Sequence, residues 1–261
     1  LYNYMLQIIV ELIKLASLII TLNKSLACAK RTAAVLAVAP GMTYPDAAEA
    51  APLGTSAVEF RDVSFTYQGA GAPSLSGVSF AAKPGDTIGV IGGTGSGKST
   101  LVDLIPRFYD ATSGSVLLDG QDVSTLPQDV LREKVGVVPQ RAQLFQGSIR
   151  DNLRWGSEHA TDAQLWRALT LAQAREVVEG KPGGLDFLLE QNGRNLSGGQ
   201  RQRLTIARAL VKEPEVLILD DSSSALDFAT DAALRRAIRS LKSTTFLVSQ
   251  RIACVRQADS I

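Results

Sequence analysis

A glycine-rich run at residues 92–99 has the residue types and spacing that bind phosphate. It reads GGTGSGKS and matches the pattern GxxxxGK[ST]. The run continues from the apolar stretch TIGVIG and leads into STLVDLIPRF, whose periodicity predicts a helix. In this order of strand, loop and helix, glycines let backbone N–H groups converge on phosphate oxygens at the positive end of the helix.

This loop predicts binding of a nucleoside triphosphate together with Mg²⁺. Lys98 is expected to reach the β- and γ-phosphates, and the Ser99 hydroxyl is expected to ligate Mg²⁺. A second motif, VLILD at 216–220, predicts a buried strand that ends in Asp220, at the strand end where doubly wound sheets bind ligands. Asp220 is therefore the Walker B candidate, a further Mg²⁺ ligand acting directly or through water. The loop residues expected to contact the nucleotide are Gly92, Gly93, Thr94, Gly95, Ser96, Gly97, Lys98, Ser99 and Thr100.

The most specific motif is LSGGQ at residues 196–200, followed by RQR. Ser197 is expected to cap the helix GGQRQRLTIARAL, whose first N–H groups would form a second anion-binding site. Since residues 92–99 already supply one phosphate site, the second suits the nucleotide of another molecule. With this motif, residues 57–261 resemble the nucleotide-binding domains of the ABC transporter family, for which LSGGQ is the signature.

The resemblance implies a fold, cofactors and site residues. The expected fold is α/β: a P-loop NTPase domain with a RecA-like core sheet, an antiparallel β subdomain and an inserted helical subdomain at about 141–205. The implied cofactors are ATP and Mg²⁺. Tyr67 is expected to stack on adenine, and Gln140 of the Q-loop to take catalytic and Mg²⁺-binding roles. Residues 224–227 match the D-loop. In the family two domains pair head to tail, so the signature would serve the partner's ATP; its residues are Ser197, Gly198, Gly199 and Gln200.

Two positions depart from the family pattern, and both concern hydrolysis. Asp221 stands where the family has a glutamate that orients the attacking water, so its carboxylate falls roughly 1.5 Å short. Gln250 stands where the family has a histidine that contacts the γ-phosphate, and an amide cannot carry a proton or a charge. The chain therefore resembles the subunit of a heterodimeric ABC exporter whose own site hydrolyses ATP weakly. A homodimer with slow hydrolysis is the alternative.

The N-terminal segment 1–22 is apolar and roughly 33 Å long as a helix, which is enough to span a bilayer. Its polar residues fall within an arc of roughly 120° on one helix face. That stripe predicts a transmembrane helix with one face toward protein or an aqueous cavity, since Glu11 and Lys14 are costly in lipid. An amphipathic helix on a surface is the alternative. The stripe consists of Asn3, Gln7, Glu11, Lys14, Ser17 and Thr21.

Around this helix we expect the end of a multi-pass transmembrane domain at 1–39, a Pro/Gly/Ala-rich linker at 40–56, and a cytoplasmic nucleotide-binding domain at 57–261. Both ends look cut, so the chain is expected to be a fragment whose nucleotide domain is truncated at its C-terminus. Fusion of membrane helix and nucleotide domain favours a half-transporter of the multidrug or lipid exporter type, located in the cell membrane.

Composition excludes several other classes. With 261 residues and a net charge of +1, the chain lacks the basic excess of a nucleic-acid-binding protein. Its two cysteines, Cys28 and Cys254, have no CxxC spacing, so neither a disulfide framework nor a zinc site is expected. A soluble ABC-type ATPase acting on DNA would carry long insertions between Ser99 and Ser197, and no heptad run is found there. The expected partners are a second half-transporter, the membrane, and an exported small molecule or lipid.

Overall fold

The computed structural model describes residues 2–38, 41–47, 54–222 and 225–261. Within it the chain divides into two compact units, Leu1–Thr43 and Tyr44–Ile261.

The first unit is dominated by one helix, α1, which spans Tyr2–Leu36 and has no buried residue. Its length and composition would allow it to cross a membrane. The C-terminal part of the polar stripe is linked by hydrogen bonds, since Lys14 Nζ lies 2.8 Å from Glu11 Oε1 and Ser17 donates to the Lys14 carbonyl at 2.7 Å. Thr21 in turn donates to the carbonyl of Ser17 at 2.8 Å. Pairing along the helix lowers the cost of placing these groups in lipid.

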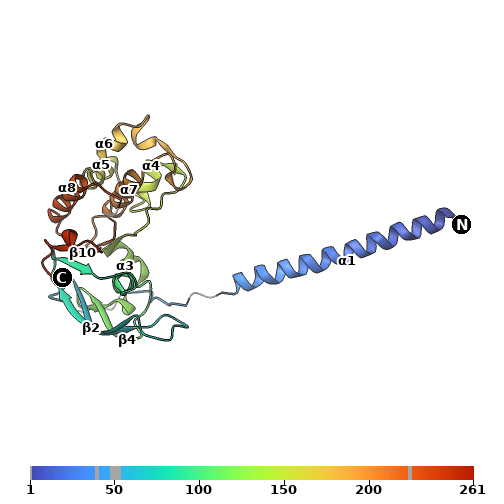
Figure 1. The fold of residues 1–261 in the computed structure, drawn as a ribbon, viewed down its shortest axis with the longest axis horizontal. Helices are drawn as coiled ribbons and strands as arrows, with labels where there is room; N and C mark the ends of the chain where they lie inside the picture. Colours follow the sequence, from blue (N-terminus) through green and yellow to red (C-terminus); the bar gives the residue numbers. More distant parts are fainter. Residues whose placement is uncertain (1, 39–40, 48–53, 223–224) are drawn as a thin grey trace. The chain divides into compact units, whose positions relative to one another are not determined.

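The second unit contains a parallel sheet in the order β3-β10-β9-β6. Its strands are short apolar runs because helices cover them, as in other parallel sheets. Helices α2 and α9 pack against β10, while α3 and α7 (Gly198–Leu210) pack against β6. Helix α8 follows β9 in the chain, and Figure 1 labels α3, α7, α8 and β10. The bounds are Thr87–Ile91 for β3, Val135–Val138 for β6, Val216–Asp220 for β9, Thr244–Ser249 for β10, Lys98–Asp103 for α2, Gln128–Lys134 for α3, Phe228–Arg239 for α8 and Ile252–Val255 for α9.

The expected antiparallel sheet is also present, in the order β2-β1-β4-β5. In β1 the buried side chains change phase, from Val58 and Phe60 to Val63 and Phe65. A register shift between Phe60 and Val63, with Asp62 at φ +48°, marks a bulge that keeps both pairs on the buried face. The bounds are Val58–Phe65 for β1, Leu75–Ala82 for β2, Ser113–Leu118 for β4 and Gln121–Asp122 for β5, with a 3₁₀ turn at Val123–Thr125.

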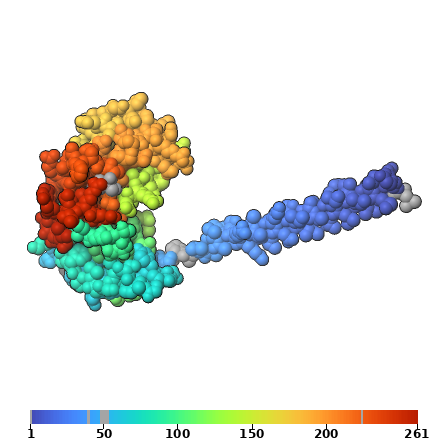
Figure 2. All heavy atoms as spheres, in the orientation of Figure 1, coloured from blue at the N-terminus to red at the C-terminus, as the bar shows by residue number. Residues whose placement is uncertain are grey.

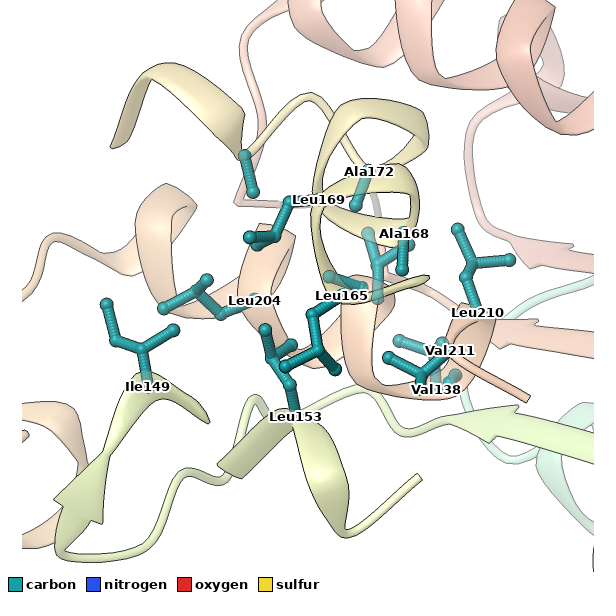
Figure 3. Close-up of a cluster of buried hydrophobic side chains, with 14 of the residues drawn as sticks. Val138, Ile149, Leu153, Leu165, Ala168, Leu169, Ala172, Leu204, Leu210 and Val211 are labelled. Carbon is teal, nitrogen blue, oxygen red and sulfur yellow. The ribbon is translucent and has the colours of Figure 1, made fainter. Parts of the chain in front are cut away.

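The inserted segment is helical, as expected. Three of its helices, α4, α5 and α7, begin with capping boxes at Ser148, Thr161 and Ser197, respectively. Side chains of these helices point toward one another in a shared core that includes Leu153, Leu165 and Leu204 (Figure 3). The bounds are Ile149–Arg154 for α4, Asp162–Leu171 for α5, Arg175–Glu179 for α6 and Gly198–Leu210 for α7, with β7 at Gly147–Ser148, β8 at Leu188–Leu189, and 3₁₀ turns at Gly184–Asp186 and Gln191–Gly193.

In the space-filling view, the antiparallel sheet (cyan) and the helical segment (yellow and orange) form two sides of the second unit (Figure 2). Helix α7 continues to Leu210 and brings Val211 into the same core as Val138 of β6. The signature helix therefore links the helical segment mechanically to the parallel sheet.

One predicted element is shorter than expected. The stretch STLVDLIPRF does not form a single helix, because α2 ends at Asp103. Beyond it, Ile105 and Arg107 donate to carbonyls three residues back, and Arg107 takes φ +54°. Pro106 lacks a backbone N–H and disfavours helical geometry in the residue before it, so the helix gives way to turns.

Candidate nucleotide-binding site

The parallel sheet gathers the predicted site residues at one edge. All four of its strands run in the same direction, so their carboxyl ends lie together. The glycine loop follows β3, Asp220 ends β9, Gln140 comes two residues after β6, and Gln250 follows β10 directly. The strand order alone therefore brings together residues that are up to about 160 positions apart in the sequence.

The glycine loop has a shape that side chains would obstruct. Gly97 takes φ +83° directly before α2, and a Cβ there would lie 2.8 Å from the carbonyl oxygen of Ser74. A Cβ on Gly92 would lie 2.5 Å from Ser96 Oγ. Lys98 Nζ donates to the Gly93 carbonyl of its own loop at 2.6 Å. The loop residues Gly93, Thr94, Gly95 and Ser96 are exposed and so accessible to a ligand.

The two strongest candidate Mg²⁺ ligands touch. Ser99 Oγ donates to Asp220 Oδ2 at 2.8 Å, which joins the start of α2 to the end of β9. Burial raises the pKa of Asp220, opposed by the Ser99 hydrogen bond and reinforced by the charge of Asp221. Burial also raises the pKa of Asp103 to about 6, and the charge of Asp220 adds to that shift.

This donor set fits Mg²⁺ bound together with phosphate. Within the part of the chain that the structure describes, no group of three or more His, Cys, Asp or Glu side chains could hold a metal by itself. Mg²⁺ characteristically takes only one or two protein carboxylates and completes its shell with phosphate oxygens and water. The hydroxyl of Ser99 and the carboxylate of Asp220 match that requirement, and a cation there would relieve the repulsion among the nearby carboxylates.

The residues expected to act in hydrolysis lie beside this pair. Gln140 Nε2 lies 3.4 Å from Asp221 Oδ2, so the glutamine expected to form the Q-loop approaches the carboxylate next to Asp220. Asp221 takes φ +42°, and its N–H donates to the Val248 carbonyl at 2.9 Å. Gln250 is exposed at the end of β10.

Tyr67 is half-buried and held from several directions. Its hydroxyl lies 3.0 Å from Thr100 Oγ1, on the helix that also carries Lys98 and Ser99. Its ring packs edge-to-face with Tyr109 at a centroid distance of 5.2 Å. No sequence motif marks Asp103 or Tyr109. Asp103 is the last residue of α2, and its raised pKa depends on burial and on the charge of the distant Asp220. Tyr109 lies in the turn that follows α2, and its contact with Tyr67 depends on how that turn packs. The aromatic pair in RFYD, directly after the expected helix, is the one sequence feature that could have drawn attention to Tyr109.

The signature forms the start of α7 as predicted. Gln200 N–H donates to Ser197 Oγ at 3.3 Å, and Ser197 N–H donates to Gln200 Oε1 at 3.0 Å. A Cβ on Gly199 would lie 3.1 Å from the Ala225 carbonyl, so the signature lies beside the segment expected to be the D-loop. Ser224 of that loop lies outside the described residues. Among the residues that the structure describes, no hydrogen bond joins the signature to the chain's own glycine loop.

Comparison with known proteins identifies the family. A family model described as ABC transporter matches residues 75–224. The chain belongs to the ABC transporter family. YfiB of Bacillus subtilis, an uncharacterized ABC transporter ATP-binding protein, is 47% identical over 204 residues, covering 78% of this chain and 36% of YfiB. The β-(1→2)glucan export ATP-binding/permease protein NdvA of Rhodopseudomonas palustris is 46% identical over 219 residues, covering 83% of this chain and 36% of NdvA.

A solved structure agrees with these relatives. A bacterial Atm1-family ABC exporter with ATP bound matches with a TM-score of 0.82 and 31% identity, covering 92% of this chain and 42% of that one. The chain thus spans less than half the length of the proteins it matches. The expected α/β nucleotide-binding fold of ABC type, preceded by a long apolar helix, is confirmed.

Proposed function

We propose that this chain is the ATP-binding part of an ABC exporter, in which ATP-driven pairing of two nucleotide domains is coupled to export across a membrane. The observation that carries the proposal is the shared strand edge, where the glycine loop, the Ser99–Asp220 pair, Asp221 and Gln250 come together. The apolar helix α1 ahead of this domain supports membrane attachment in one polypeptide. The likeness to a glucan export protein and to an Atm1-family exporter supports the direction of transport.

Each site residue then has a role in binding ATP. Tyr67 stacks on the adenine, and the amides of residues 92–97 bind phosphate oxygens. Lys98 leaves the Gly93 carbonyl to neutralise the β- and γ-phosphates. Ser99 and Asp220, with Gln140, would hold Mg²⁺, and the ion would neutralise charge on the phosphate oxygens.

We further propose that this site holds ATP better than it hydrolyses it. Asp221 and Gln250 occupy the positions of the water-orienting carboxylate and of the γ-phosphate contact, but neither has the reach or the charge that those roles use. The backbone of Asp221 lies at φ +42°, a conformation that Asp adopts more readily than most residues with a side chain. The residues expected to bind ATP are therefore those of the family pattern, whereas the two positions expected to act in hydrolysis depart from it.

The partner follows from the signature. Residues Ser197–Gln200 form a helix start in which Ser197 and Gly198 are exposed, and no described hydrogen bond links it to the chain's own glycine loop. We propose that this start completes the ATP site of a second half-transporter, with hydrolysis concentrated there. The pair is then a heterodimer located in the cell membrane as a multi-pass protein, with its nucleotide domains in the cytoplasm. Its cargo is an exported small molecule or lipid that passes the polar stripe of α1.

The test is turnover and nucleotide retention in the complete transporter. The partner's catalytic glutamate is replaced by glutamine, so that any remaining hydrolysis comes from this chain's site. We expect ATP to photo-crosslink to this chain with almost no phosphate release, and Lys98→Ala to abolish the crosslink. Robust phosphate release in this background would refute weak hydrolysis, and absence of a crosslink in the parent would refute ATP binding.

A further inference from the structure

Three aromatic rings meet beside the start of α2. The Tyr67 ring lies edge-to-face with Phe65, at 4.7 Å and 85°, and with Tyr109, at 5.2 Å and 86°. Phe65 and Tyr109 also touch each other, at 5.4 Å and 49°, so the three contacts close a triad. The Tyr67 hydroxyl is held separately by Thr100. The ring that is proposed to stack on adenine is therefore fixed by two neighbouring rings and one hydrogen bond.

The segment that carries Tyr109 is itself clamped. Arg107, only 5% exposed, donates from Nε and Nη2 to the two carboxylate oxygens of Asp110, at 2.6 and 3.2 Å. Its Nη1 also donates to the Ser124 carbonyl at 3.1 Å. This fork closes a short loop around Phe108 and Tyr109, in which Arg107 takes φ +54°. Bidentate pairing of this kind fixes geometry as well as adding energy, so Tyr109 is presented to Tyr67 from a rigid turn.

The two neighbours of Tyr67 differ in what they can do. Phe65 is a core residue, 5% exposed, and it supports β1 as much as it supports Tyr67. Tyr109 is 41% exposed, so replacing its side chain is expected to disturb the hydrophobic core less than replacing Phe65 would. Its ring packs against the rings of Phe65 and Tyr67. Of the triad, Tyr109 is the member whose contacts serve the orientation of the Tyr67 ring.

We propose that Tyr109 is a positioning residue for nucleobase recognition: it holds the Tyr67 ring in the plane that stacks on the adenine of ATP. This inference rests on the proposed function, in which residues 92–99 bind the triphosphate and Tyr67 binds the base. Without Tyr109, the Tyr67 ring can adopt more orientations in the free protein. Stacking on adenine then has to restrict the ring to one of them, and this entropy cost lowers the affinity for ATP. The triphosphate contacts are made by backbone amides and Lys98, so they do not depend on Tyr109.

Because the base and the triphosphate contact different residues in this proposal, the two kinds of binding can be measured separately. In the complete transporter, with the partner's own P-loop lysine replaced so that only this site is read, ATP and inorganic tripolyphosphate are each titrated by competition against labelled ATP. We expect Tyr109→Ala and Tyr109→Leu to weaken ATP binding about three- to tenfold, the range of one aromatic contact. Tripolyphosphate binding is expected to change less than about twofold. Tyr109→Phe keeps the ring and is expected to restore ATP affinity, and Phe108→Ala, next in the same turn, is expected to leave both affinities unchanged.

The outcomes separate this inference from the function on which it rests. If Tyr67→Ala weakens ATP binding but Tyr109→Ala and Tyr109→Leu do not, the positioning role is wrong while base stacking stands. Equal loss of ATP and tripolyphosphate affinity in both Tyr109 variants would also overturn it, because the damage would then be to the fold of the site. No effect of Tyr67→Ala removes base stacking and the inference together. A parent that binds neither ligand refutes the proposed function itself.

Discussion

Replacing Asp221 and Gln250 with the residues that the family has at these positions is the strongest test of the proposal that this site hydrolyses ATP weakly. Asp221→Glu adds one methylene and moves the carboxylate about 1.5 Å farther from the backbone. Gln250→His adds a ring that can carry a proton, at an exposed position where no core packing resists it. A positioned general base contributes about 10²–10⁴-fold to a rate, or ~3–5 kcal/mol of barrier.

The structure sets a limit on the recovery. Asp221 takes φ +42°, a region in which Asp is several-fold enriched over most residues with a side chain. Replacing it with Glu forfeits that preference, which corresponds to about 1 kcal/mol or roughly a fivefold effect. Even at the low end of general-base catalysis, about 20-fold recovery remains. We therefore expect the double substitution to raise turnover at this site at least tenfold, and more than either single change.

The assay is ATP hydrolysis by the assembled transporter with the partner's catalytic glutamate replaced by glutamine. Asp221→Asn is the matched control, since it keeps the size and backbone preference of Asp but cannot act as a base. Its turnover is expected to stay at the parent's low level. A parent that already hydrolyses ATP rapidly, or an Asp221→Asn variant that loses substantial activity, would show that Asp221 is a working base and would refute the reasoning.

Three further outcomes test other parts of the molecule. In equilibrium titrations, Tyr67→Ala is expected to weaken ATP binding by ~1–3 kcal/mol, while Tyr67→Trp is expected to preserve it. Lys98→Ala is expected to weaken ATP binding more than Tyr67→Ala does. Unchanged ATP affinity in Tyr67→Ala would exclude stacking. In the full transporter, Gln7→Cys on the polar stripe of α1 is expected to react with a water-soluble maleimide and Ile9→Cys to react poorly; equal labelling would remove the pathway interpretation. Leu165 is 0% exposed in the helical core, so Leu165→Ala leaves a cavity that is expected to cost about 2–5 kcal/mol of stability. The unfolding midpoint in differential scanning fluorimetry is expected to fall by roughly 5–15 °C. An unchanged midpoint would show that this core contributes little to stability.

Features that depend on neighbouring residues were predictable from the sequence. The glycine loop, the Walker B strand and the signature helix each arise within about a dozen residues, through strand patterning, capping and glycine geometry. Ser148, Thr161 and Ser197 all begin helices through capping boxes, an interaction that closes within one turn. The helix predicted after the glycine loop was too long, because Pro106 interrupts the helix even though the amphipathic pattern continues past it.

Features that depend on strand order and packing were decided only by the tertiary structure. Parallel pairing of β10 with both β3 and β9 brings Ser99 to Asp220, 121 residues away. Parallel pairing of β6 with β9 brings Gln140 to Asp221, 81 residues away. No local pattern predicts the left-handed backbone at Asp221, since it arises where the strand end turns while donating to the neighbouring strand at Val248. The contact of Tyr109 with Tyr67 likewise requires β1 to lie beside the turn after α2. The sequence by itself thus determined which chemical groups this protein carries, because motifs are short-range, whereas their distances and orientations were decided by long-range packing of the sheet.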